Sequence, residues 1–215
     1  MVEKKLLLMG FQKFGPYTYN ISEHIVEALD GKTIKINTTT SIKIIGIKLP
    51  IDFDTFRKVV ATTIKDTQPQ IVIWLGMDFK DTSNLSLEVV AHALPEYGTK
   101  IKDKDGKIGK TIALDTLPKT IRIPNEKQVE TAIAKIKEIK ISENAGRHMC
   151  ETVLRDSIRL SDHGKKFQPV FIHLPHTPEL LVQSIKLEKH IHSMTEEKQK
   201  KIIKSIIKKI GSFYL

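Results

Sequence analysis

Residues 139–150 read Ile-Lys-Ile-Ser-Glu-Asn-Ala-Gly-Arg-His-Met-Cys. Ile139–Ser142 has the pattern of a short strand end, and Asn144–Gly146 is a turn of small residues. From His148 to Leu160 apolar residues recur at helical spacing, so we predict a helix over 147–160. A strand that passes through a short turn into a helix is typical of an α/β fold.

The same alternation continues on both sides of this segment. We predict strands at 4–11, within 33–48, and at 71–75, 85–93, 139–142 and 169–174. We predict helices at 20–30, 53–66, 125–138, 147–160 and 195–211, the last with a capping box from Ser193 to Glu196. The sequence therefore predicts one α/β domain over 1–215, an open twisted mixed sheet with helices on both faces. Active residues belong at carboxyl strand ends, where Gly10, Gly76, Ser142 and His173 fall.

Cys150 is the only cysteine, which excludes internal disulfides and multi-cysteine metal sites. Its thiol is then either a small core group or a nucleophile. The first turn of a helix gathers unpaired N–H groups and positive potential, which favour a thiolate and can hold an oxyanion. A nucleophile needs a base, and His173 interrupts the apolar run 168–174 close to its end.

Both segments resemble motifs of pyroglutamyl peptidase I, also called pyrrolidone-carboxylate peptidase, a family of cysteine peptidases. The first matches Ser-x-x-Ala-Gly-x-x-x-Cys, and the second matches Phe-Ile-His-Val-Pro-x-x-Pro-Glu with Leu174 in place of Val. The family's Gly-Phe-Glu-Pro-Phe-Gly appears as Gly10-Phe11-Gln12-Lys13-Phe14-Gly15. These motifs follow the family's order over nearly the whole chain, which is identified as a divergent member.

The resemblance implies a phosphorylase/hydrolase-like fold, a homotetramer, and removal of an N-terminal pyroglutamyl residue from peptides without a cofactor. It implies Cys150 as the nucleophile, His173 as the base, and Glu88 as the residue that orients His173. Glu88 lies in an apolar strand, where a carboxylate needs a partner such as His173. Should Glu88 not fill this role, the next candidates are Glu143, Glu151 and Asp78.

The resemblance also places the substrate site around four apolar residues. In the family, two aromatic residues clamp the flat lactam ring of pyroglutamate, and they correspond to Phe11 and Phe14. Met149 takes the position of an apolar pocket residue, and backbone groups around Met77 would contact the lactam. Plain core packing is the alternative explanation for the two phenylalanines and for Met149.

Several departures from the family pattern leave other functions open. Residues 76–84 lack the family's arginine, Glu151 replaces an Asn after the nucleophile, and the loops over 94–118 look shortened. These departures motivate a thiol amidase with an altered N-terminal substrate as one alternative. The formal net charge of +10 and Glu151 motivate a second, a non-catalytic basic binding protein on the same fold.

The composition argues against two further classes of partner, nucleic acids and membranes. Lysines on polar helix faces explain most of the charge, so we expect no nucleic-acid partner. No apolar run approaches the roughly 20 residues that span a bilayer, so we expect no membrane partner. No signal-peptide pattern is evident either, and a free catalytic thiol suits a cytoplasmic location.

No metal or nucleotide is expected either. The histidine pairs at 173 and 176 and at 190 and 192 lack a cluster of carboxylates at ligand spacing. Gly10 to Gly15 lacks the Gly-Lys-Ser/Thr that cradles a phosphate.

Overall fold

A seven-stranded mixed sheet forms the centre of the computed structural model, which describes residues 2–14, 19–78, 83–93, 118–146, 149–183 and 192–215. The strand order is β2-β3-β1-β4-β9-β5-β8. The strands are β1 (Val2–Phe11), β2 (Thr33–Lys35), β3 (Thr40–Leu49), β4 (Ile71–Met77), β5 (Leu85–Glu88), β8 (Ile139–Ser142) and β9 (Gln168–Leu174).

Strand direction changes once on each side of the parallel centre. β3, β1, β4 and β9 are parallel to one another, β2 pairs antiparallel with β3, and β5 pairs antiparallel with β9. β8 runs parallel to β5 at the edge of the sheet. Every residue of β4 and β9 is buried, as expected for parallel strands that are covered on both faces.

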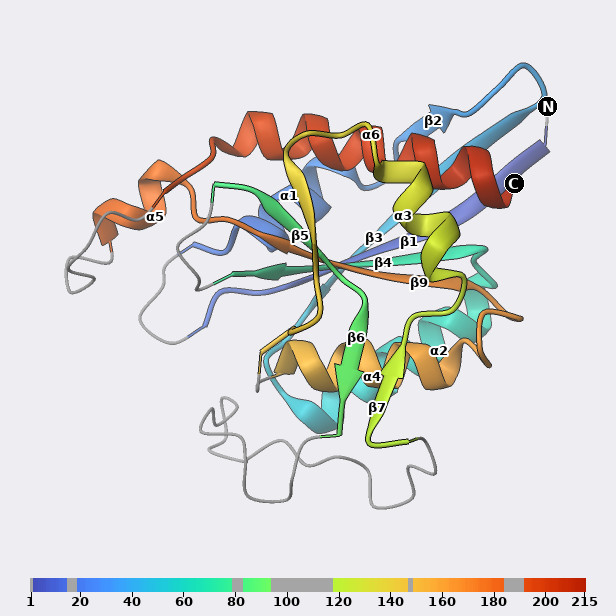
Figure 1. Ribbon diagram of the computed structural model, residues 1–215, viewed down its shortest axis with the longest axis horizontal. Helices are drawn as coiled ribbons and strands as arrows, with labels where there is room; N and C mark the ends of the chain where they lie inside the picture. Colours follow the sequence, from blue (N-terminus) through green and yellow to red (C-terminus); the bar gives the residue numbers. More distant parts are fainter. Residues whose placement is uncertain (1, 15–18, 79–82, 94–117, 147–148, 184–191) are drawn as a thin grey trace.

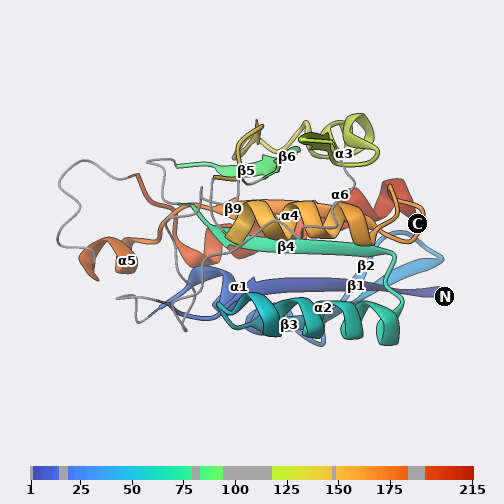
Figure 2. The same ribbon diagram turned by 90° about the horizontal axis from the view of Figure 1, so that it is seen from below.

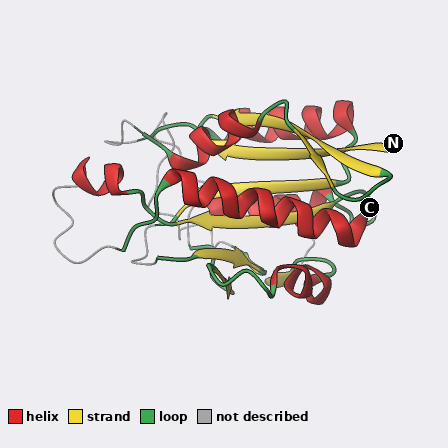
Figure 3. Ribbon diagram, turned by 90° about the horizontal axis from the view of Figure 1, so that it is seen from above, coloured by secondary structure: helices red, strands yellow, loops and turns green. Residues whose placement is uncertain are grey.

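Helices cover both faces of the sheet, which confirms the predicted fold class (Figures 1 and 2). On one face lie α1 (Ile21–Leu29) and α6 (Glu196–Tyr214), with α3 (Glu126–Ile133) beside α6 (Figure 3). On the other face lie α2 (Phe53–Thr67) and α4 (Met149–Leu160). The short α5 (Pro178–Gln183) lies beyond the carboxyl ends of the parallel strands, at the opposite end of the molecule from the two termini. Within the described ranges, no helix is long and apolar enough to cross a membrane.

A small two-stranded ribbon lies outside the main sheet. Its strands β6 (Val90–His92) and β7 (Thr120–Arg122) pair antiparallel, and β6 packs against α4. The ribbon continues directly from β5, so the chain leaves the central sheet immediately after Glu88 (Figure 1).

The end of β1 is fixed by the first helix. The Ser22 hydroxyl accepts a hydrogen bond from the Phe11 N–H at 2.9 Å, and the side chain of the N-cap residue Asn20 accepts one from the Ser22 N–H at 3.0 Å. A Cβ at Gly10 would lie 2.6 Å from the Ser22 carbonyl oxygen, so only glycine fits this close approach. The glycine of the N-terminal motif therefore lets α1 pack directly on β1.

Three sequence predictions were wrong in detail. The strand predicted at 85–93 is two strands in different sheets, because the chain turns out of the main sheet at Val89. The helix predicted at 125–138 ends at Ile133, since the chain must turn back to pair Ile139 with Leu85. Thr195, not Ser193, caps α6, and its side chain accepts from the Lys198 N–H. β7 and α5 were not predicted.

The four residues predicted at carboxyl strand ends do not all lie at one edge of the sheet. Gly10, Gly76 and His173 lie at one carboxyl edge, because β1, β4 and β9 are parallel and in register there. Ser142 ends a strand of the opposite direction and pairs with Glu88. The site is therefore assembled where strands of two directions meet, rather than along a single edge.

Candidate active site

His173 lies near the end of β9, between β4 and β5. It is 5 % exposed, and its register partners are Gly76 on β4 and Ser86 on β5. A Cβ at Gly76 would lie 3.0 Å from the imidazole Cδ2, so the absence of a side chain there leaves space for the ring. The Phe171 ring meets the imidazole edge-on, with the two ring centroids 5.0 Å apart.

Glu88 reaches the same imidazole from β5. Its carboxylate is completely buried, and the Nδ1–H of His173 donates to Oε1 over 2.8 Å. The partner expected for Glu88 is therefore present. Because Nδ1 faces Glu88, Nε2 is the ring nitrogen available to a nucleophile.

Cys150 lies in the first turn of α4, half-buried, with its side chain hydrogen-bonded to His173. Burial by itself lowers the pKa of His173, but charge attraction and hydrogen bonding to Cys150 and Glu88 outweigh it and raise that pKa to about 10. An imidazole with a raised pKa is a stronger base for the proton of a neighbouring nucleophile. A sulfur nucleophile, an imidazole and a buried carboxylate thus lie in sequence, an arrangement that can perform acyl transfer.

The alternative partners of His173 lie elsewhere. The carboxylate of Glu143 pairs with Arg122 at 2.7 Å on the surface. Asp78 is buried beside His176 at the ends of β4 and β9. Glu151 points at β6, where it accepts a hydrogen bond from the His92 N–H. Of these four carboxylates, only Glu88 makes a described hydrogen bond to His173.

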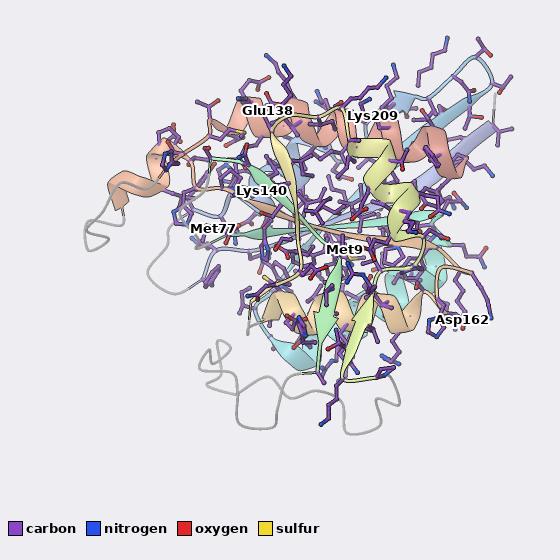
Figure 4. All side chains as sticks on the ribbon, viewed as in Figure 1. Met9, Met77, Glu138, Lys140, Asp162 and Lys209 are labelled. Atoms are coloured by element: carbon purple, nitrogen blue, oxygen red, sulfur yellow. The ribbon has the colours of Figure 1, made fainter. Side chains whose placement is uncertain are left out.

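The four expected substrate residues are mostly buried. Phe11 and Met77 are each 4 % exposed and end the neighbouring strands β1 and β4. Figure 4 shows Met77 at the carboxyl end of β4, far from Asp162, which follows α4 at the other end of the molecule. Met149 is 6 % exposed next to Cys150, whereas Phe14 is half-buried against the core. Residues 79–82 and 94–117, which include most of the departures from the family pattern, fall outside the described residues.

Sequence reasoning missed the contacts between α4 and the ribbon. The His92 N–H donates to Glu151, and the Arg155 guanidinium donates to the Pro118 carbonyl oxygen over 2.8 Å. Glu151 and Arg155 are four residues apart on one helix face and almost fully buried. Their opposite charges, four residues apart on the helix that follows the predicted nucleophile, are the signal in the sequence that could have indicated a buried polar contact.

Metal ligation finds no support in the described part of the chain, where no three His, Cys, Asp or Glu side chains are grouped to hold an ion. His190, one of the histidines considered for such a site, lies outside it.

Comparison with known proteins decides the family. The model of the pyroglutamyl peptidase family matches residues 4–211. The chain belongs to this family. The pyrrolidone-carboxylate peptidase of Pyrococcus furiosus is 31 % identical over 189 residues, which cover 84 % of this chain and 85 % of that protein. Human pyroglutamyl-peptidase 1 is 23 % identical over 183 residues, which cover 80 % and 79 % of the two chains.

Solved structures of the family share the fold. A mutant pyrrolidone carboxyl peptidase of Pyrococcus furiosus aligns with a TM-score of 0.83 and 26 % identity, over 98 % of this chain and all of the other. The enzyme of Thermococcus litoralis aligns with a TM-score of 0.78 and 26 % identity, over 96 % and 92 % of the two chains. The similarity therefore extends over the whole catalytic fold of this pyroglutamyl peptidase family member.

Glu151 predicts a measurable dependence of stability on pH. Burial is the largest cause and raises its pKa, and the charge of Glu88 raises it further. The hydrogen bond from the His92 N–H and the charges of His92 and Arg155 lower it, and the pKa that results is about 7 instead of 4.5. Between these two values the unfolded chain has released this proton while the folded chain still holds it, so stability falls as the pH rises. Glu151→Gln has no such proton. We compare the urea midpoints of Glu151→Gln and of the unsubstituted protein at each pH. The difference should grow in favour of the variant between about pH 4.5 and about pH 7, and it should stay constant above pH 7. A difference that does not change with pH in urea denaturation would contradict the assignment.

Proposed function

We propose that this chain is a cysteine peptidase that removes an N-terminal pyroglutamyl residue from peptides. One observation carries the proposal. Buried Glu88 binds His173 at 2.8 Å, and His173 in turn bonds Cys150 at the start of a helix, in a member of the pyroglutamyl peptidase family. We assign Cys150 as the nucleophile, His173 as the acid and base, and Glu88 as the residue that orients His173.

The first half of the reaction forms a thioester. The Cys150 thiolate attacks the carbonyl carbon between pyroglutamate and the next residue, and the carbonyl oxygen becomes an oxyanion. N–H groups in the first turn of α4, including that of Cys150, stabilise this oxyanion. The protonated His173 gives its proton to the departing amine, the C–N bond breaks, and the shortened peptide leaves.

The second half consumes water. Neutral His173 takes a proton from a water molecule, whose oxygen attacks the thioester carbonyl carbon. The C–S bond breaks, free pyroglutamate leaves, and the thiolate and imidazolium are restored. Glu88 keeps Nδ1 protonated throughout, so Nε2 is the nitrogen that exchanges the proton in both halves.

For substrate binding, we assign Phe11, Phe14, Met77 and Met149. A lactam is flat, small and uncharged, and aromatic faces and apolar side chains suit such a ring. Phe14 is the most exposed of the four and so the one best able to contact a ligand without a shift of the core.

We also propose a cytoplasmic enzyme, because a reactive thiol persists in a reducing compartment. We further propose a homotetramer, which light scattering would reveal as four times the mass of the chain.

Replacing the nucleophile should stop the reaction without unfolding the protein. Cys150→Ser should lower turnover of a chromogenic pyroglutamyl amide by about a thousandfold or more, because the three residues act as a unit. The urea unfolding midpoint serves as the control and should stay close to that of the unsubstituted protein. Turnover within tenfold of the original would exclude Cys150 as the nucleophile.

Replacing the orienting carboxylate should change the alkaline limb of the pH profile. His173 loses its proton near pH 10, so kcat/KM should persist to about pH 9 and then fall. Glu88→Gln removes a negative charge that raises the His173 pKa, so the fall should move to lower pH and turnover should decrease. His173→Ala should decrease turnover further. An unchanged limb with full turnover in Glu88→Gln would show that another residue orients His173.

Specificity separates the proposed enzyme from an amidase with another substrate. Pyroglutamyl and prolyl amides differ by the ring carbonyl, and a site that hydrogen-bonds this oxygen should prefer the pyroglutamyl amide by about a hundredfold or more. Phe14→Ala should raise KM for the pyroglutamyl amide, whereas Lys13→Ala, a change at an exposed neighbour, should alter it little. Equal kcat/KM for the two amides would favour the altered-substrate amidase, and turnover of neither would favour the binding protein.

A further inference from the structure

The residue after Cys150 makes an unusual contact. Glu151 is in the first turn of α4 and only 1 % exposed, and its Oε1 accepts a hydrogen bond from the backbone N–H of His92. His92 is the last residue of β6, in the ribbon that continues from β5. The bond therefore joins the helix that carries Cys150 to the segment that carries Glu88.

His92 is itself held from two other sides. Its Nδ1 lies 3.3 Å from the Thr120 Oγ1 on β7, and its Nε2 lies 3.1 Å from the backbone oxygen of Glu143. One helical turn beyond Glu151, Arg155 bonds the Pro118 carbonyl oxygen at the start of the ribbon's second arm. Hydrogen bonds from Glu151 and from Arg155 thus connect α4 to the ribbon, and the bond of Glu151 is the nearer of these two to Cys150.

The bond acts on the spacing of the proposed triad. Glu151 is covalently next to Cys150, and His92 follows Glu88 by four residues. Cys150 and Glu88 both contact the imidazole of His173. Any slip of α4 against the ribbon would therefore change the distance from Cys150 to His173 while the bond from Glu88 to His173 stayed in place. A shift of about 1 Å in a reacting group can cost about a hundredfold in rate.

We propose that Glu151 is a positioning residue, which ties the start of α4 to β6 and so sets the spacing of Cys150 and Glu88 around His173. The proposal rests on the proposed function for its effect on turnover. Its effect on the reactivity of the thiol can be measured without any substrate.

The strength of the hydrogen bond between Glu151 and the His92 N–H depends on the charge of Glu151. The carboxyl faces Glu88 from β5, His92 from β6 and Arg155 from its own helix, and it titrates near neutral pH. Once ionised, it accepts a stronger, charge-assisted bond from the His92 N–H. This stronger bond should hold Cys150 more firmly beside His173 and so make the thiol more reactive as the pH rises through about 7.

The test compares Glu151→Gln and Glu151→Ala with the matched control Glu143→Gln. The control removes the same charge from an exposed carboxylate nearby, which pairs with Arg122, and leaves the backbone oxygen that holds His92. Two quantities are measured from about pH 5 to about pH 9: the rate at which iodoacetamide alkylates Cys150, and kcat and KM for a pyroglutamyl amide.

The amide oxygen of Gln can still accept the bond but cannot ionise. Glu151→Gln should therefore keep kcat within about threefold near pH 7 and lose the step in the alkylation profile there. Glu151→Ala lacks the acceptor and should alkylate and turn over about tenfold more slowly, with KM within about twofold. Glu143→Gln should keep the full profile.

Two results would overturn the proposal. One is an alkylation profile of Glu151→Gln that superimposes on that of the unsubstituted protein; this comparison decides the matter even if Glu151→Ala does not fold. The other is a folded Glu151→Ala with unchanged alkylation and kcat. If the unsubstituted protein alkylates with the Glu151-dependent step but turns over no pyroglutamyl amide, the proposed function fails and the positioning role stands.

Discussion

The buried contact between Glu88 and His173 constrains most of this structure. A carboxylate removed from water costs several kcal/mol unless a hydrogen-bonded partner meets it, so strand placement must bring the two residues together. The antiparallel pairing of β5 with β9 does this, because it sets Ser86 opposite His173 and brings Glu88 within reach of Nδ1. Gly76 leaves space for the imidazole on the other side. Cys150, the third residue of the proposed triad, then contacts His173 from α4, on the face of the sheet that α2 and α4 cover.

Local sequence patterns determined much of this architecture. Short apolar runs, continuous in β4 and interrupted by His173 in β9, predicted these two strands, because strands that are covered on both faces have no polar side. The apolar stripe of α6 and the small-residue turn before α4 were equally informative. Cys150 and His173 could be predicted as partners from chemistry, and the family resemblance added Glu88.

Long-range pairing accounts for what the sequence did not predict. Residues 85–91 are all buried, and nothing in their composition marks Val89 as the point where the chain leaves one sheet for another. The direction of β8 is set by its partner β5 rather than by its own residues, so the sequence did not indicate that Ser142 ends a strand antiparallel to β9. The bond from His92 to Glu151 joins residues 59 positions apart, and it forms only after the ribbon folds back on α4.

In the proposed reaction, Cys150 carries the pyroglutamyl group as a thioester. The most direct measurement mixes the protein with an excess of a pyroglutamyl ester, whose leaving group makes formation of the thioester fast relative to its hydrolysis. The sample is then quenched in acid, and the protein is mapped by peptide mass spectrometry. We expect one added pyroglutamyl group per active site, located on Cys150 and absent from Cys150→Ser. Hydrolysis of the ester at full rate with the group on another residue, or with undiminished rate in Cys150→Ser, would contradict it.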